Sequence, residues 1–108
     1  MKFTVATTER AARDIEDISD WWARERSAEQ ALRWYQGVHA AIASLEKSPE
    51  RCAVATESSE LRYEVRQLPY GLRSRPTHRI LFTIVRETVV VLTVRHVARG
   101  PLTDVDLS

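Results

Sequence analysis

The chain has 108 residues, of which 44% are hydrophobic and 29% charged, with a formal net charge of +1. This is ordinary globular composition, and it excludes a disordered chain or a fibre. The length is enough for one hydrophobic core, so we expect a single domain. The single cysteine, Cys52, cannot form an internal disulfide, and no apolar run approaches the roughly 20 residues that span a bilayer. We therefore expect a cytoplasmic protein.

The first elements along the chain are a short strand over residues 2–6 and a helix that ends near Arg26. Thr7 or Thr8 is the expected N-cap of this helix. Its apolar residues recur at helical spacing and form one face: Ala11, Ile15, Ile18 and Trp22. The acidic residues of this helix, such as Asp14 and Asp17, are expected to form a solvated face.

A second helix is predicted to begin after Ser27, which forms a capping box with Gln30, and to end at Ser48-Pro49. Its apolar face consists of Ala31, Tyr35, Val38, Ile42 and Leu45. The link between the helices is only a residue or two, so they should form an antiparallel hairpin.

Aromatic residues gather around this link, namely Trp21, Trp22, Trp34 and Tyr35. Most of them are expected to pack in the core. Adjacent tryptophans cannot face the same way, however, so Trp21 or Trp34 is a candidate for contact with a partner. Gly37, inside the second helix, predicts a close approach of the other helix or the sheet.

The second half of the chain has the pattern of strands. Residues 50–60 show no period and are predicted to be a loop, whereas alternation of Leu61, Tyr63 and Val65 with charged residues predicts a half-buried strand. Pro69-Tyr70-Gly71 is typical of a turn. Two apolar stretches, 77–85 and 88–97, should form a hairpin that turns at Arg86-Glu87. The expected fold is α+β in the order β-α-α-β-β-β, an antiparallel sheet with the helical hairpin packed on one face.

Charge is concentrated in one part of the sequence. Residues 62–99 contain eight arginines, no lysine and two glutamates, and so carry a net charge of +6. Arginine suits bidentate contact with phosphate or carboxylate, so the segment predicts an anionic partner, either nucleic acid or an acidic protein segment. The alternative is that these arginines only keep a sheet edge soluble.

The two ends of the predicted hairpin bring basic residues together at one end of the sheet. A two-residue turn would pair Arg79 with Val94, with His96 close to Arg79 on the same face, and would pair His78 with Arg95 on the opposite face. A register shifted by one residue would exchange these faces. Arg73 and Arg75 would reach the same end from the preceding loop, and Arg99 from the chain that leaves it.

Such a cluster has two possible uses. Guanidinium groups can neutralise a phosphate in RNA cleavage while an imidazole moves protons, and the same groups can grip an acidic peptide. His39 is expected to be a structural or surface residue. Cys52 and the three histidines lack the spacing of metal ligands, and the sequence has no phosphate-binding loop, so we expect no metal and no cofactor.

The chain resembles the RelE/ParE superfamily, toxins of type II toxin–antitoxin systems that are often labelled plasmid stabilisation proteins. The segments that carry the resemblance are "DIEDISDWW", "LRYEVRQLPYG", "HRILFTI" and "TVVVLTVRHVAR", together with the order of elements. It implies one toxin domain over residues 1–99, followed by an acidic, flexible tail over residues 100–108. It also implies a cognate antitoxin as partner.

The resemblance implies one of two mechanisms. RelE-like members cleave messenger RNA on the ribosome with arginines on the third strand and after the fourth, lysines in the loop before the third, and a tyrosine in the tail. Arg79 and Arg99 match the arginine positions, but Tyr70 and Leu72 occupy the loop positions and the tail has no tyrosine. ParE-like members instead poison DNA gyrase, and the long helical hairpin looks more like theirs.

We therefore expect a growth-inhibiting toxin closer to ParE, which a cognate antitoxin neutralises. The residues expected to bind an anion or a partner are Arg73, Arg75, His78, Arg95, Trp21 and Trp34. The first alternative is a ribosome-dependent, metal-independent endoribonuclease in which Arg79, Arg99 and His96 are catalytic. The second alternative is a decayed toxin that only binds its antitoxin.

Overall fold

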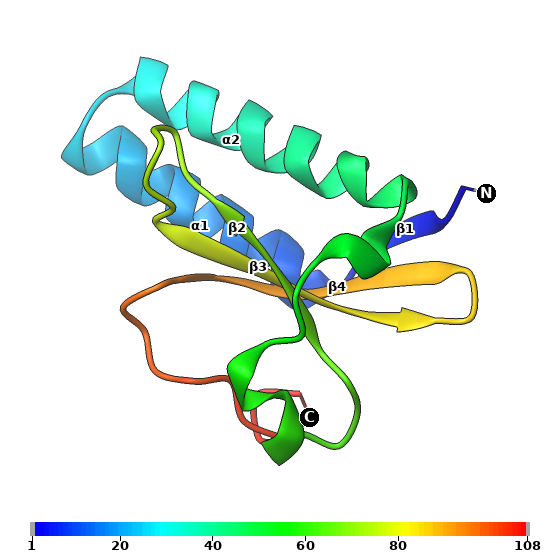
Figure 1. Ribbon diagram of the computed structural model, residues 1–108. Helices are drawn as coiled ribbons and strands as arrows, with labels where there is room; N and C mark the ends of the chain where they lie inside the picture. The colour runs from blue at the N-terminus through cyan, green and yellow to red at the C-terminus, as the bar shows by residue number, and fades with distance from the viewer. Residues whose placement is uncertain (1, 108) are drawn as a thin grey trace.

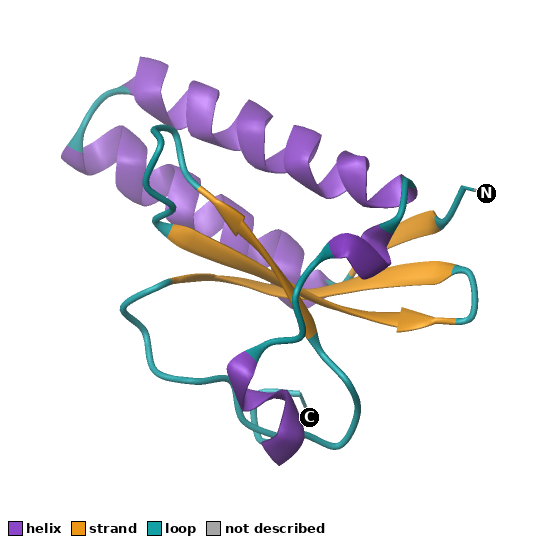
Figure 2. Cartoon of the chain, in the orientation of Figure 1, coloured by secondary structure: helices purple, strands orange, loops and turns teal. Residues whose placement is uncertain are grey.

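A computed structural model describes residues 2–107, which form a four-stranded sheet with a helical hairpin on one face (Figures 1 and 2). The helices and strands are β1 (Thr4–Thr7), α1 (Glu9–Glu25), α2 (Ala28–Ala43), β2 (Arg66–Tyr70), β3 (His78–Val85) and β4 (Thr88–His96). Short 3₁₀ segments lie between α2 and β2, at Ser44–Glu46, Pro49–Arg51 and Thr56–Glu60. The predicted α+β class and order of elements are confirmed.

The sheet has the strand order β1-β4-β3-β2. β2, β3 and β4 are antiparallel, but β1 runs parallel to β4, with Thr4 opposite Thr88 and Thr7 opposite Val91. The sheet is therefore mixed, whereas the sequence suggested a fully antiparallel one. Alternation within a strand indicates which residues share a face, but it carries no information on the direction of a strand distant in sequence.

The helical hairpin forms with both predicted N-caps, but the predicted capping box is only half present, because the Gln30 Oε1 accepts no hydrogen bond. The Thr8 hydroxyl accepts from the Ala11 N–H at 3.1 Å, and the Ser27 hydroxyl accepts from the Gln30 N–H at 3.0 Å. The apolar helix faces pack on the sheet in one core that includes Ala11, Ile15, Trp34, Val38, Ile42, Ile80, Phe82, Val89 and Val91. In α2 the fully buried aromatic residue is Trp34, whereas Tyr35 is half-buried.

β2 lies further along the chain than predicted. The strand covers Arg66–Tyr70, so the predicted strand over 61–66 and the predicted turn at Pro69 are both wrong. Proline cannot donate to a strand ladder, but β2 is at the edge of the sheet, where this is tolerated. Leu61 and Val65 lie in irregular backbone, and their side chains pack in a small second core. Their alternation with charged residues comes from this packing and not from a strand.

The β3–β4 hairpin turns at Arg86-Glu87 as predicted, with Val85 opposite Thr88. A bulge in β4 then shifts the register, so His78 pairs with His96 and Arg79 pairs with Arg95. The predicted pairing of Arg79 with Val94 is therefore wrong. One extra residue in a strand changes every pair beyond it, and nothing in the apolar run marks where that residue is inserted.

The face of the sheet away from the helices carries the small second core of Ala55, Val65, Leu81 and Leu102. Residues 100–107, expected to be a flexible tail, pack there together with the 3₁₀ segment Thr56–Glu60 (Figure 1), and Leu102 is buried. The predicted solvated face of α1 also needs correction. Asp14 accepts from the Val94 N–H at 3.2 Å and from the Thr93 hydroxyl. It thus provides a partner for a backbone N–H of β4 beyond the end of β1.

Candidate binding surfaces at the basic end of the sheet

The predicted basic cluster is divided between the two faces of the sheet. His78 and His96 lie on the face covered by the helices, where His78 contacts Trp34 with ring centroids 5.2 Å apart. Arg79 and Arg95, which pair with each other, point to the opposite face. The cluster is therefore two separate sites.

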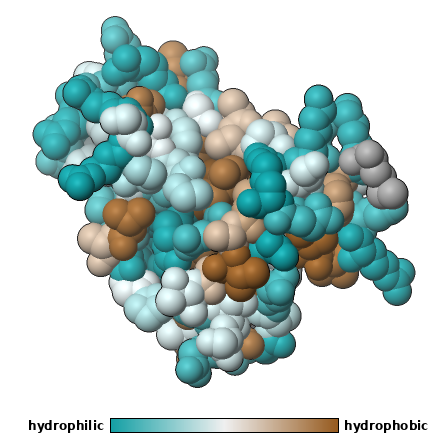
Figure 3. Space-filling model, in the orientation of Figure 1, coloured by the Kyte–Doolittle hydropathy of each residue, from teal (hydrophilic) through white to brown (hydrophobic). Residues whose placement is uncertain are grey.

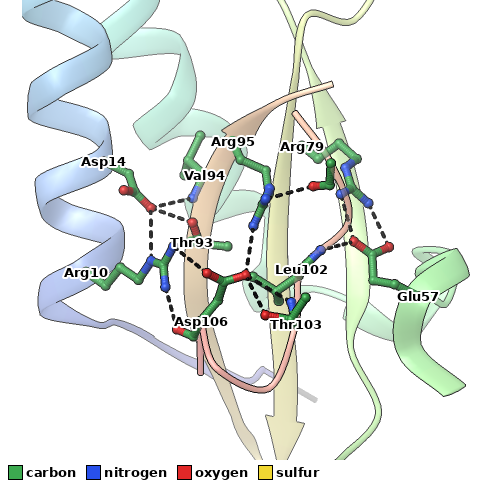
Figure 4. Close-up of polar contacts among 11 residues, drawn as sticks. Arg10, Asp14, Glu57, Arg79, Thr93, Val94, Arg95, Leu102, Thr103 and Asp106 are labelled. Atoms are coloured by element: carbon green, nitrogen blue, oxygen red, sulfur yellow. Dashed lines mark hydrogen bonds and ion pairs between the residues drawn. The ribbon is translucent and has the colours of Figure 1, made fainter. Parts of the chain in front are cut away.

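On the far face, Arg79 is held by an ion pair with Glu57, from the 3₁₀ segment Thr56–Glu60 (Figure 4). Its two terminal nitrogens donate to the two Glu57 carboxylate oxygens at 3.0 and 2.8 Å, and one also donates to Gln67 at 3.0 Å. The Leu102 N–H donates to the same carboxylate at 2.9 Å. The hydrogen bond from Arg79 has the largest effect on the pKa of Glu57, and together with that from the Leu102 N–H it lowers this pKa to about 2. Glu57 is therefore ionised, and it neutralises Arg79.

Arg95 is enclosed beside this pair, with 4% of its side chain exposed. It donates to the Gly100 carbonyl at 2.7 Å and lies 3.7 Å from the Asp106 carboxylate. Burial lowers the pKa of Arg95. Asp106 also accepts from the Thr103 N–H and lies 3.7 Å from Arg10 (Figure 4). Arg95 was expected to bind an anion or a partner. It instead fastens the C-terminal segment to the sheet, and it is closed to an external ligand.

A cavity of about 570 Å³ on the far face is lined by both Arg79 and Arg99. The structure thus brings together the two arginines that match the nuclease positions. Three acidic residues line the same cavity, namely Glu57, Glu60 and Asp104. His96 is not among its lining residues; it lines a cavity on the helix side. The three predicted catalytic residues therefore do not form one site.

The two histidines differ in burial. His78 is buried, shares a hydrogen bond between its Nδ1 and the Thr77 hydroxyl at 2.8 Å, and lies with its ring 5.2 Å from that of His96. Burial, with a smaller effect from His96, lowers the pKa of His78 to about 4, so this imidazole is neutral near pH 7. His96 is exposed, and its Nδ1 accepts from the Ala98 N–H at 3.0 Å.

The open surface at this end of the sheet is on the helix side. Two cavities, of about 680 and 490 Å³, share Trp22, Arg26 and Thr77 as lining residues. The first is also lined by Gln30, Arg33, Leu72, Arg73 and Arg75, and the second by Asp17, Ile18, Trp21, His78 and His96. We call the two cavities together the helix-side groove. Arg73 and Arg75, two of the residues expected to bind an anion, line it from the loop between β2 and β3, which lies beside the α1–α2 link in Figure 1.

The two candidate tryptophans have opposite environments. Trp21 lines the helix-side groove with 43% of its surface exposed. Trp34 has no exposed surface, so its expected contact with a partner is wrong. Other large exposed apolar side chains, such as Leu32 and Val85, are far apart in sequence. Figure 3 shows the apolar groups on the face in view as separated patches among hydrophilic side chains.

Sequence reasoning missed several residues of these surfaces. Glu57 lies in a segment whose apolar residues follow neither helical nor strand periodicity, and nothing in the sequence marks it as the partner of Arg79. Arg26 and Arg33 were detectable, because the α1–α2 hairpin places both near its link. Within residues 2–107, no three His, Cys, Asp or Glu side chains are grouped so that they could hold a metal ion. No helix in this range is long and apolar enough to cross a membrane.

The sequence matches the family model described as "ParE toxin of type II toxin-antitoxin system, parDE" over residues 5–101. The chain belongs to this family. The fold is shared by a protein of the chromosomal ParDE toxin–antitoxin system of P. aeruginosa, with a TM-score of 0.71 and 21% identity, over 89% of this chain and 97% of that one. A mutant of the E. coli toxin RelE in the free state aligns with a TM-score of 0.56 and 15% identity, over 91% of this chain and 86% of that one. No curated protein sequence matches significantly.

Proposed function

We propose that this ParE-family toxin arrests growth in the cytoplasm by binding DNA gyrase, without cleaving RNA, and that a cognate antitoxin neutralises it. Membership of the ParE family supports a toxin that pairs with an antitoxin. An acidic or amphipathic segment of that antitoxin would cover the helical hairpin and the basic end of the sheet, as a helix in a groove or a strand added to a sheet edge.

The observation that carries the choice of mechanism is the ion pair between Arg79 and Glu57. A nuclease needs its arginine free to neutralise the phosphate as charge develops in the transition state. Here Glu57 already occupies both terminal nitrogens of Arg79, and its Oε2 also accepts from the Leu102 N–H. A phosphate would have to displace a carboxylate that the fold keeps ionised and buried.

One observation favours the nuclease alternative. Arg79 and Arg99 line one cavity, as two arginines of an RNA-cleaving site would. The same cavity is lined by three carboxylates against two arginines, so it has no excess of positive charge to attract the RNA backbone. The candidate proton carrier His96 lines the helix-side groove instead. The nuclease is therefore the second candidate.

Induction of the protein in growing cells distinguishes the two functions. Mapping of transcript 5′ ends and the superhelical density of a reporter plasmid are followed together, with and without co-expression of the antitoxin. We expect growth to stop and supercoiling to fall while messages stay intact, and we expect the antitoxin to restore both growth and supercoiling. New cleavage sites within coding regions at unchanged supercoiling would overturn the proposal, as would the absence of any growth defect.

A further inference from the structure

We infer that the helix-side groove binds a nucleoside polyphosphate, with the phosphates among its arginines and the base against its tryptophans. The basic half of the groove combines arginines from three elements: Arg26 just after α1, Arg33 of α2, and Arg73 and Arg75 of the β2–β3 loop. None of these four has an ion-pair partner among the described residues, and none of the residues that line this cavity is acidic.

This charge arrangement favours a compact anion of several charges. Four guanidinium groups around one cavity repel each other, and a ligand with two or three phosphates would remove that repulsion through bidentate contacts. The cavity of about 680 Å³ has the size of a small-molecule site. The far face shows the contrast, since Arg79 and Arg95 there already have carboxylates of the chain beside them.

Two buried polar atoms in the same wall lack partners. The Trp22 Nε1–H, a donor, and the Gln30 Oε1, an acceptor, are both inaccessible to solvent and form no hydrogen bond. Both residues line the basic cavity. Buried polar groups in folded proteins are nearly always paired, and these two would gain partners if their side chains turned toward a polar ligand in the cavity.

The other half of the groove suits a planar ring. Trp21 and Trp22 meet edge to face with centroids 5.6 Å apart, and Ile18 completes the apolar wall. The Arg26 guanidinium lies 5.8 Å from the centre of the Trp21 ring. Asp17, Thr77 and His96 add polar groups that can read the edge of a base. Trp21 is the exposed ring of the two, and exposed aromatic rings stack with nucleobases.

A nucleotide is a small ligand that uses both halves. Inorganic phosphate chains would leave the tryptophan half empty, and a nucleoside would leave the arginines unpaired. The shared residues Trp22 and Arg26 place the two halves side by side, as a base and its phosphates are. This inference goes beyond the proposed function and does not depend on the target of the toxin.

Titration calorimetry on the purified protein tests this inference, with ATP, GTP, adenosine, inorganic triphosphate, single-stranded RNA and a glutamate-rich peptide as separate probes. We expect ATP or GTP to bind at least tenfold more tightly than each of the other probes. The double substitution of Arg73→Ala with Arg75→Ala should weaken nucleotide binding at least tenfold. Trp21→Ala should weaken nucleotide binding and leave triphosphate binding unchanged. Arg24→Ala, an exposed arginine of α1 outside the groove, is the matched control and should change nothing.

Four results would overturn the inference. The first is the absence of nucleotide binding, and the second is equal affinity for ATP and triphosphate. The third is tighter binding of the RNA or the acidic peptide. The fourth is loss of nucleotide affinity in the Arg24→Ala control to the same extent as in the groove variants. The substituted residues are exposed, so the variants should fold, and circular dichroism checks this.

Discussion

Glu57 and Arg79 form a bidentate ion pair whose side chains are 7% and 16% exposed. Both Glu57 oxygens accept hydrogen bonds, and the pair joins the 3₁₀ segment Thr56–Glu60, β3 and the C-terminal segment. For single residues, this pair changes the interpretation of Arg79, which is catalytic only in the nuclease alternative that the resemblance to RelE-like members implies. Arg79 has a structural role on the far face, and it is not free to bind a phosphate.

Replacement of Glu57 should be strongly destabilising because it leaves the largely enclosed Arg79 side chain without a counter-charge. We expect Glu57→Ala to lower the free energy of unfolding by about 3 kcal/mol. The double variant Glu57→Leu with Arg79→Met should lose less than Glu57→Ala, because it leaves no unpaired charge. Urea unfolding of the single and double variants measures the difference. A loss below about 1 kcal/mol for Glu57→Ala would show that the pair is weak, as exposed pairs are.

His78 should make the protein sensitive to mild acid. Its pKa is lowered from 6.5 to about 4 in the folded state, so the unfolded chain binds a proton between these values while the folded chain does not. Stability is therefore lost as pH falls from 6.5 to 4, by about 3 kcal/mol for this group. We expect His78→Phe to flatten the dependence of unfolding free energy on pH in this window. The control His39→Gln should keep the full loss of stability in this pH window. If His78→Phe also kept it in full, the loss could not be attributed to His78.

At the scale of elements, α2 and β2 meet where Gly37 faces Tyr70. A Cβ atom at Gly37 would lie 2.0 Å from the Tyr70 hydroxyl oxygen, and that hydroxyl donates to the Trp34 carbonyl at 3.1 Å. The close approach predicted from this glycine is confirmed. The side chain of an edge strand is thus fixed to the backbone of the covering helix.

Gly37→Ala should therefore destabilise the protein although alanine is the better helix former. We expect a loss of about 1–2 kcal/mol, typical of overpacking, in place of the gain of about 1 kcal/mol that helix propensity alone predicts. The loss should shrink in the Tyr70→Phe background, where the clashing oxygen is absent. Thermal unfolding of the two single variants and the double variant measures this coupling. A raised melting temperature for Gly37→Ala would contradict the packing.

The elements that the sequence predicts well are those with local signals. Thr8 and Ser27 mark the starts of both helices, and the dense apolar runs mark β3 and β4. β2 was misplaced because an edge strand tolerates Pro69, and because Val65 is buried from irregular backbone. The bulge in β4 and the parallel pairing of β1 result from tertiary packing, to which no single segment of the sequence points.

At the scale of the whole molecule, the C-terminal segment covers the sheet face opposite the helices. Leu102 fills the small second core, and Asp106 lies beside Arg10 and Arg95. Because the contacts of the C-terminal segment depend on the folded chain, the site too could be predicted only in part. The sequence indicates that a basic end exists, but partners such as Glu57 and Asp106 come from segments whose position only the folded chain determines.

Leu102 should be as important as a residue of the main core. We expect Leu102→Ala to lower the free energy of unfolding by about 2–3 kcal/mol, because it leaves a cavity over Leu81 and Val65. The nearby Val105, with 82% of its surface exposed, provides the matched control, and Val105→Ala should leave stability nearly unchanged. Urea unfolding separates the two. Equal, small effects would indicate that the segment is detached from the sheet in solution.

We propose that this toxin acts by binding DNA gyrase and not by cutting RNA. The most direct test adds the purified protein to gyrase-catalysed supercoiling of relaxed plasmid, with cleavage of messenger RNA on programmed ribosomes followed in parallel. We expect supercoiling to be inhibited as the amount of toxin approaches that of gyrase, the antitoxin to relieve this inhibition, and the messenger to stay intact. Unimpaired supercoiling together with cleaved messenger would contradict it.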